Sequence, residues 1–530
     1  MLFAVALIAA CNAYPGNAPA LLRGAPSPTI VQTTAGPIEG RSTAKGQAFL
    51  GIPYAAAPLG DLRWQPPQAV ARWTSPRPAR STGSPCVQAI GLKAATGGGG
   101  GIVTGDEDCL YLNLYAPPAA ARPSGGWPVM VFIHGGAFTL GAGDNYDPSP
   151  LVMAQGMVVV TFNYRLGAFG FLAHPALRAE HPEGGSGNFA LLDQQALLRW
   201  VRDNAAAVGA DPGRITLAGE SAGAWSVCQH LVSPRSAGLF HRAILQSGSC
   251  AEPLSLAEAG AADAAGRAYA AQSGCLGESD ADALSCLRQR STRQVARAPA
   301  TRRGINGAGS WGHVWGDALV PLAPARAFAD GRWNAVPTIV GSNLNEGRLF
   351  ALSTRSDEAY VRRVQTEYGA SAAAVLARYP IDASGGSASA AYAAVMTDSR
   401  FACPAEALRR QMAARAAVYG YEFADTAAPT TLPRLLTGGP MGAYHAAELA
   451  YVFGASWALT DVTKFDAAQQ ALSRRMMDAW GAFVRDGAPP ADWPRSDPQG
   501  RGLRTWQPAT AVVAGDFFAS HACDFWQGVR

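Results

Sequence analysis

The stretch that most constrains the fold of this chain is the sequence Gly-Glu-Ser-Ala-Gly at residues 219–223. It follows an apolar, strand-like run at 214–218 and opens into a helix-compatible segment at 222–231. A serine flanked by glycines at a turn from strand to helix is typical of a nucleophile elbow, whose sharp backbone turn lifts the hydroxyl out of the sheet. The amino end of the following helix also favours negative charge beside that hydroxyl. Ser221 is therefore the predicted nucleophile of a protein that contains both strands and helices.

A second glycine-rich turn supplies backbone amides, which a nucleophilic serine needs as an oxyanion hole. The apolar run at 127–133 predicts a buried strand, and it leads directly into His-Gly-Gly-Ala-Phe at 134–138. Glycines allow a backbone to approach a substrate closely and to direct its amides inward. We expect the amides of Gly135, Gly136 and Ala222 to form a three-donor oxyanion hole. A flexible turn after a strand is the simpler alternative for this segment.

Strand and helix patterns alternate along the chain. Short apolar runs predict buried strands at 129–133, 158–162, 215–218, 243–246 and 338–341. The segment 193–208 predicts a helix, and the segment 466–484 predicts another with one apolar face, made of Leu472, Met476, Trp480, Phe483 and Val484. This alternation favours a mostly parallel sheet covered by helices.

Four further segments carry a family resemblance: Phe-Leu-Gly-Ile-Pro-Tyr-Ala at 49–55, Glu-Asp-Cys-Leu-Tyr-Leu-Asn at 107–113, Asn-Tyr-Arg-Leu-Gly at 163–167 and Gly-Asn-Phe-Ala-Leu-Leu-Asp-Gln at 187–194. With the serine and glycine motifs, they make the chain resemble the type-B carboxylesterases, the cholinesterase-like branch of the α/β-hydrolase superfamily, over residues 29–526. The resemblance implies an α/β-hydrolase fold, a large, mostly parallel central sheet flanked by helices, with helical excursions around an active-site gorge. It also implies one catalytic domain over 29–530, preceded by a leader and linker over 1–28.

The resemblance assigns the remaining catalytic residues. The family's triad acid is a glutamate in a turn after a strand, which matches Glu346 in Ser-Asn-Leu-Asn-Glu-Gly at 342–347; Asp398 is the runner-up. Of the eight histidines, His445 in the segment 442–454 matches the family's catalytic-histidine loop. Ser221, Glu346 and His445 follow the chain order expected of α/β-hydrolases. Glu448 is expected to be a supporting or a surface group.

These roles predict a serine carboxylesterase. His445 takes the Ser221 proton, an acyl-enzyme forms and water hydrolyses it. Activity should fall as the pH drops through the pKa of the histidine, about 6.5 when unperturbed. The mechanism needs no metal or organic cofactor, and the partner is a small-molecule ester. A net charge of +4 with scattered basic residues argues against nucleic acid as a partner.

Cysteines indicate the compartment. The resemblance implies disulfides Cys86–Cys109, Cys275–Cys286 and Cys403–Cys523. Cys228 and Cys250 remain, on the helix after the elbow and after the next strand, and they form either a fourth bridge or two buried thiols. Even three bridges imply an oxidising compartment.

The amino-terminal segment supports export. The apolar run at 2–10 is too short for a transmembrane span and resembles the core of a signal peptide. Ile-Ala-Ala-Cys at 8–11 resembles a bacterial lipobox, with Cys11 as the lipid anchor; cleavage near Ala13 to give a freely secreted enzyme is the alternative. The sequence contains no Asn-x-Ser/Thr glycosylation site, which favours a bacterial exported protein.

The substrate is less constrained than the reaction. Between Cys86 and Cys109 the cholinesterases carry a tryptophan that stacks on quaternary ammonium groups, whereas this chain has glycines at 97–101 and no tryptophan there. Choline esters are therefore poor candidates, and we expect broad specificity. A specialised lipase or aromatic-ester esterase and a catalytically silent binding or adhesion protein are the alternatives. The oligomeric state stays open.

Overall fold

The computed structural model describes residues 19–91, 99–250, 256–303, 309–509 and 516–529. Over these residues the chain forms a 12-stranded sheet in the order β1-β2-β3-β7-β9-β8-β10-β11-β16-β17-β18, with β4 beside β2. The pairs from β9 to β18 are parallel, whereas those from β1 to β9 are antiparallel. The strands are β1 (Ser27–Gln32), β2 (Pro37–Thr43), β3 (Gly46–Pro53), β4 (Arg77–Pro78), β7 (Tyr111–Ala116), β8 (Trp127–Ile133), β9 (Val158–Phe162), β10 (Ala210–Glu220), β11 (Arg242–Gln246), β16 (Thr338–Asn343), β17 (Val418–Phe423) and β18 (Leu503–Trp506).

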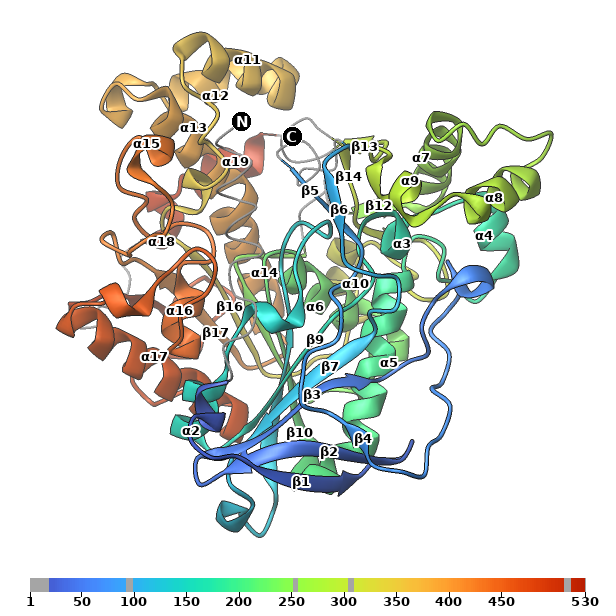
Figure 1. Cartoon of the computed structure of the whole chain (residues 1–530). Coiled ribbons are helices and arrows are strands. Elements are labelled where there is room, and N and C mark those ends of the chain that lie inside the picture. Colours follow the sequence, from blue (N-terminus) through green and yellow to red (C-terminus); the bar gives the residue numbers. More distant parts are fainter. Residues whose placement is uncertain (1–18, 92–98, 251–255, 304–308, 510–515, 530) are drawn as a thin grey trace.

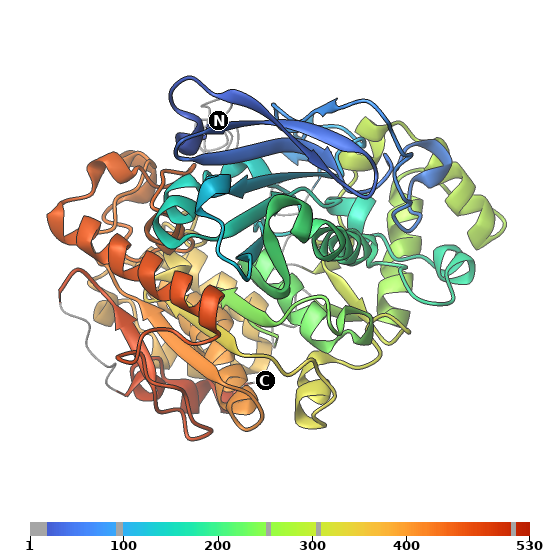
Figure 2. The ribbon, with the colours of Figure 1, turned by 90° about the horizontal axis from the view of Figure 1, so that it is seen from below.

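Helices flank this sheet and rise beyond one end of it (Figure 1). The α-helices are α2 (Ser149–Gln155), α3 (Gly167–Phe171), α4 (Pro175–Glu180), α5 (Phe189–Asn204), α6 (Ala222–Val232), α7 (Ala259–Gln272), α8 (Asp280–Gln289), α9 (Thr292–Arg297), α10 (Pro324–Ala329), α11 (Asp357–Tyr368), α12 (Ala372–Arg378), α13 (Ala388–Met396), α14 (Cys403–Ala413), α15 (Arg434–Thr437), α16 (Glu448–Phe453), α17 (Ala467–Asp486), α18 (Phe517–Ser520) and α19 (Cys523–Gly528). Figure 2 follows the strands from the blue amino-terminal edge to the orange and red carboxyl-terminal edge. The expected α/β-hydrolase architecture, a large and mostly parallel sheet flanked by helices, is confirmed.

Several shorter elements complete the described chain. Three small two-stranded sheets pair β5 (Gln88–Ile90) with β6 (Ile102–Thr104), β12 (Leu256–Glu258) with β15 (His313–Trp315), and β13 (Arg302–Arg303) with β14 (Gly309–Ser310). The short 3-10 helices are η1 (Ala20–Leu22), η2 (Gly60–Leu62), η4 (Ala119–Ala121), η5 (Gly143–Asn145), η6 (Ala205–Val208), η7 (Pro234–Ser236), η9 (Glu346–Arg348), η10 (Gly369–Ser371), η11 (Asp382–Ser384) and η13 (Val462–Lys464). A π-helix, η12 (Thr397–Ala402), joins α13 to α14. Of these elements, η9 and η12 bear on the site described below.

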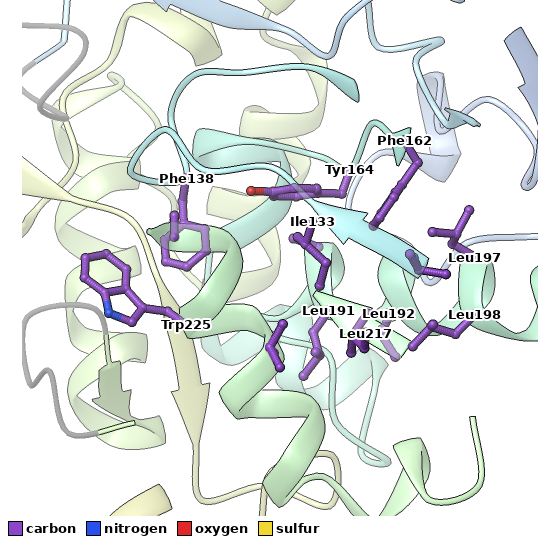
Figure 3. Packing of buried hydrophobic residues seen from close by; sticks show 14 of the residues in the cluster. Ile133, Phe138, Phe162, Tyr164, Leu191, Leu192, Leu197, Leu198, Leu217 and Trp225 are labelled. Carbon is purple, nitrogen blue, oxygen red and sulfur yellow. The ribbon is translucent and has the colours of Figure 1, made fainter. Parts of the chain in front are cut away.

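The central strands supply two apolar cores, one on each face of the sheet. Successive side chains of a strand point to opposite faces, so β8 divides between the two cores. Val131 and Ile133 join the core that contains Leu198 of α5, whereas Phe132 joins the core that contains Trp480 of α17. Figure 3 shows the first core, with the α5 leucines beside Ile133. Burial on both faces explains why these strands are apolar throughout and not alternating.

The predicted helices are present with small changes at their ends. The segment 466–484 forms α17, whose expected apolar face is buried. Asp466 caps it by accepting from the Gln469 amide at 2.8 Å, and Gly487 ends it at φ 77°. The helix expected at 193–208 is α5, which begins earlier, at Phe189, and ends at Asn204, followed by the 3-10 turn η6.

Four disulfides join cysteines of the described chain: Cys86–Cys109, Cys228–Cys250, Cys275–Cys286 and Cys403–Cys523. The question left open for Cys228 and Cys250 is therefore answered by a bridge, which ties α6 to the segment after β11. Bridges of this kind indicate an exported protein, folded in an oxidising compartment. None of the helices in the described ranges has the length and apolar character that crossing a membrane requires. Cys11, Ala13 and Gly97 lie outside the described residues.

Candidate active site

Ser221 lies at the end of β10 with a backbone that only a tight turn produces. Its φ is 55° and its ψ is −122°, and its amide donates to the Gln246 carbonyl at 2.9 Å. The flanking glycines are required by contact: a Cβ on Gly219 would lie 2.4 Å from the Gly223 carbonyl carbon, and one on Gly223 would lie 2.0 Å from the Ile133 oxygen. The Gly-x-Ser-x-Gly motif therefore lets α6 pack against β8 while it turns Ser221 out of the sheet.

The glycine-rich loop after β8 lies against this turn. A Cβ on Gly135 would lie 3.1 Å from the Ser221 Cβ, and Gly136 has a φ of 106°, which favours glycine. In the described part of the chain, the recorded backbone hydrogen bonds leave the amides of Gly135 and Gly136 unpaired. The amide of Ala222 belongs to the first turn of α6, where helix amides have no partner within the helix. Gly135 and Ala222 thus lie next to Ser221, and Gly136 follows Gly135 in the same loop.

A buried histidine holds the glycine loop. The ring of His134 stacks on Tyr164 with a centroid distance of 4.4 Å, and the Tyr164 hydroxyl donates to the His134 carbonyl at 2.8 Å. Burial lowers the pKa of His134 to about 4, so its ring is neutral at physiological pH. His134 therefore places no competing positive charge beside the loop amides.

Glu346 and His445 form a buried pair. Glu346 opens η9 directly after β16, and its Oε2 lies 2.6 Å from the His445 Nδ1. Both side chains are buried. An imidazole that donates through Nδ1 to a carboxylate presents Nε2 as the proton acceptor. The arrangement can therefore take a proton from a nearby hydroxyl and stabilise the imidazolium that results.

Two asparagines fix the loop that carries His445. The Asn343 amide donates to Glu346 Oε1 at 2.7 Å, and its side chain donates to the Tyr444 carbonyl at 2.9 Å. Asn345 accepts from the Ala443 amide at 3.1 Å and donates its own amide to the Ala443 carbonyl at 3.0 Å. The sequence Ser-Asn-Leu-Asn-Glu thus supplies the carboxylate together with the groups that position its histidine.

The runner-up acid, Asp398, is not beside His445. Its Oδ1 lies 2.6 Å from Nδ1 of a different histidine, His521. The His445 ring instead contacts two phenylalanines, Phe350 and Phe401, each with a ring-centroid distance of 5.0 Å. These rings exclude water from one side of the imidazole.

Two further carboxyl groups belong to this site, and sequence reasoning missed the first of them. Oε1 of Glu220, the residue before the serine, lies 3.2 Å from His445 Nε2. Glu448 is fully buried and accepts from Gln246 Nε2 at 3.1 Å, so of the two expected positions, supporting or surface, the supporting one is found. Glu220 lies inside the Gly-x-Ser-x-Gly motif, and this position next to Ser221 could have indicated that its carboxyl group belongs to the site. Nothing local distinguishes Glu448 from an exposed helical glutamate, because its burial depends on how α16 packs.

The carboxyl groups change the expected proton affinity of the histidine. Burial alone would lower the pKa of His445, but the charges of Glu220, Glu346 and Glu448 outweigh it and raise the pKa above the ordinary 6.5. Burial in turn raises the pKa of Glu220 and brings that of Glu448 to about 7. A general base must be neutral to act, so the acid limb of kcat/KM is expected above pH 6.5 and not at it.

Replacing the carboxylate nearest Nε2 tests this expectation. Glu220→Gln removes one negative charge from His445, so its pKa should fall and the acid limb of kcat/KM should move down by about one to three pH units. Asp425→Asn is a matched control, because Asp425 is a buried carboxylate bonded to Tyr451 and Gln469, away from His445. An acid limb at the same pH in Glu220→Gln and wild type would refute this account of the histidine pKa.

Two buried ion pairs join segments of the chain near the site. Arg63 Nη2 lies 2.5 Å from Glu107 Oε1, and Arg165 Nη2 lies 2.7 Å from Asp193 Oδ1. Both pairs are buried. Arg165 and Asp193 join the segment after β9 to α5, below the glycine loop, and so support the site without entering it.

Comparisons with known proteins agree with this chemistry. A sequence model described as the Carboxylesterase family matches residues 27–526. The curated relatives include the fumonisin B1 esterase of Sphingopyxis macrogoltabida, 35% identical over 490 residues that cover 89% of this chain and 86% of that protein. The cocaine esterase of Homo sapiens is 34% identical over 511 residues, with 91% and 87% covered. An acylcarnitine hydrolase of Mus musculus is 32% identical over 475 residues, with 85% and 81% covered.

Proposed function

Because this chain belongs to the carboxylesterase family and is a carboxylic ester hydrolase, we propose that it works through an acyl-enzyme on Ser221, with Glu346 and His445 completing the triad. The observation that carries the proposal is the buried hydrogen bond of 2.6 Å between Glu346 Oε2 and His445 Nδ1, beside a serine in a strained turn. Each partner comes from a loop at the carboxyl end of the sheet.

The proton steps follow from that hydrogen bond. His445 accepts the Ser221 proton through Nε2 as the hydroxyl oxygen attacks the ester carbonyl, and it then protonates the departing alcohol. Glu346 holds the Nδ1–H tautomer and stabilises the imidazolium. Water repeats the same sequence on the acyl-enzyme, which releases the acid and restores the serine.

The backbone amides around the serine supply the oxyanion hole. In this proposal, Gly135, Gly136 and Ala222 donate to the oxygen that becomes negative in the tetrahedral intermediate. Their fixed positions require no reorganisation during the reaction, and one such donor contributes about 3 kcal/mol in serine hydrolases.

Broad specificity is the favoured substrate range. The relatives named above act on fumonisin B1, cocaine and acylcarnitine, and this chain resembles them to nearly the same degree. A specialised lipase or aromatic-ester esterase is the second candidate. The catalytically silent binding protein is disfavoured, because the listed relatives are named as esterases and a hydrolase and this chain has Ser221, Glu346 and His445 at the proposed triad positions.

Processing and location complete the proposal. In this proposal a single catalytic domain covers residues 29–530 of a bacterial exported enzyme, and residues 1–28 are its leader and linker, of which Leu21, Leu22 and the start of β1 pack onto the domain. A lipid on Cys11 or cleavage near Ala13 gives the anchored or the free form. The disulfides support the export, and the lipobox-like sequence at 8–11 supports the anchor.

Hydrolysis of p-nitrophenyl esters from acetate to decanoate tests the substrate range. A broad carboxylesterase should give its highest kcat/KM at short acyl chains and decline gradually with length. A sharp maximum at octanoate or decanoate would favour the lipase alternative. Failure of every ester in the series, in a folded protein whose Ser221 also resists a fluorophosphonate, would refute the acyl-enzyme proposal.

A further inference from the structure

A second histidine lies buried between two carboxylates, away from the proposed triad. His521 follows α18; its Nδ1 lies 2.6 Å from Asp398 Oδ1 and its Nε2 lies 2.8 Å from Glu422 Oε1. The three residues are 4%, 7% and 8% exposed. Both contacts are hydrogen bonds, and an imidazolium, which donates from both ring nitrogens, satisfies both carboxylates. The Tyr379 hydroxyl donates to Asp398 Oδ2 at 2.7 Å and completes the surroundings of that carboxylate.

The π-helix η12 connects this cluster to the proposed triad. Besides Asp398, it contains Thr397, whose Oγ1 accepts from the Gly347 amide at 3.0 Å, and Phe401, whose ring contacts His445. Gly347 directly follows Glu346, and a Cβ on it would lie 2.0 Å from the Ala393 carbonyl oxygen, so it packs directly on α13. Segments of π-helix are uncommon and often lie at functional sites.

We infer that His521 and Asp398 are positioning residues for ester hydrolysis, because their ion pair holds η12 in the conformation that places Thr397 against Gly347 and Phe401 against His445. The inference rests on the proposed roles of Glu346 and His445. Displacing η12 shifts the carboxylate and the imidazole relative to each other, and misplacement by about 1 Å can cost 100-fold in rate.

The charge on His521 makes this support dependent on pH. Burial alone would lower the pKa of His521, but the hydrogen bonds and charges of Asp398 and Glu422 outweigh it and raise the pKa to about 9. Among the described residues, these two carboxylates, from η12 and β17, are the charges that act on the ring. Since the pKa is raised on folding, the stabilisation is complete below about pH 6.5 and is lost as the pH rises through 9.

Above that pH the cluster holds two buried carboxylates and a neutral ring. A neutral imidazole donates through one nitrogen only, and its other nitrogen then faces a carboxylate oxygen with a lone pair. Either Asp398 or Glu422 then loses its donor, so the ring no longer links η12 to β17 through two hydrogen bonds. The activity should therefore have an alkaline limb that originates at His521.

Two substitutions in the full-length enzyme test the inference. His521→Arg keeps a permanent cation with donors for both carboxylates, so the fall of kcat expected near pH 9 in wild type should be absent from this variant up to pH 10. His521→Gln removes the charge, so kcat should fall by between about tenfold and 100-fold at pH 8 with little change in KM. The rate of Ser221 labelling by a fluorophosphonate, measured at pH 8 and 9.5, compares wild type with the two variants in a second way. This assay avoids the spontaneous hydrolysis of esters at high pH.

His230→Gln is the matched control, since His230 is a buried histidine bonded to the neutral side chains Ser236 and Gln194. It should lower the melting temperature and leave the alkaline limb in place. The inference is wrong if His521→Arg and wild type lose kcat at the same pH, or if His521→Gln lowers only the melting temperature. Should His521→Gln fail to fold, the comparison with His521→Arg still decides. Absence of Ser221 labelling in wild type would instead refute the proposed function.

Discussion

Ser221→Ala is expected to lower kcat for p-nitrophenyl acetate by about 10⁶-fold, the loss typical of removing the nucleophile of a serine hydrolase. The variant should fold normally, because alanine can replace serine at φ 55° without adding a clash. It should also bind the substrate, since the glycine loop at 134–138 is unchanged. The measurement is steady-state turnover together with the melting temperature of both proteins.

Ser247→Ala provides a control of the same residue type. Ser247 is also buried and also has a positive φ, 51°, but it lies one strand away, at the end of β11. It should keep most of the activity and remain reactive towards a fluorophosphonate. Residual hydrolysis by Ser221→Ala at a tenth of the wild-type rate would show that another group is the nucleophile.

Glu346→Gln is expected to lower kcat by about 10⁴-fold while the fold stays intact. The amide can occupy the position of the carboxylate, but it does not stabilise the imidazolium and it allows the wrong tautomer of His445. The same substitution at the runner-up acid, Asp398→Asn, should cost at most about 100-fold, because Asp398 acts only through η12. Measuring kcat for both variants on one ester ranks the two carboxylates.

The reverse order of effects would contradict the assignment. If Asp398→Asn lost more activity than Glu346→Gln, Glu346 would not be the triad acid. Comparable melting temperatures for the two variants are the condition for this comparison. Circular dichroism at the assay temperature checks that condition.

The parts of the site that local sequence determines were predictable. Gly219 is demanded by contact with Gly223 within one strand–turn–helix unit, and Gly223 by contact with Ile133 of the neighbouring strand, so the motif indicates the conformation. The same holds for Gly135 and Gly136, which follow a strand that is apolar along its whole length. The resemblance added Glu346 and His445, which no local pattern distinguishes from other acidic and histidine residues of the chain.

The parts that depend on tertiary packing were not predictable. Cys228 and Cys250 are bridged because α6 and the segment after β11 bring their Cα atoms to 5.4 Å, a consequence of sheet order that the spacing of the cysteines does not reveal. Glu448 and His521 carry their roles through burial against distant segments. A charged residue on a short helix, such as Glu448 on α16, is normally exposed, and nothing next to His521 in the sequence indicates its burial.

The bridge between Cys403 and Cys523 also bears on how the enzyme is made. Cys523 and the edge strand β18 follow every proposed catalytic residue in the sequence, and domains assemble during synthesis from the amino end. A growing chain can already contain Ser221, Glu346 and His445 before the segment with His521 is available to anchor η12. Hydrolytic activity therefore appears late in biogenesis, after translocation and thiol oxidation, and it reports that both are complete.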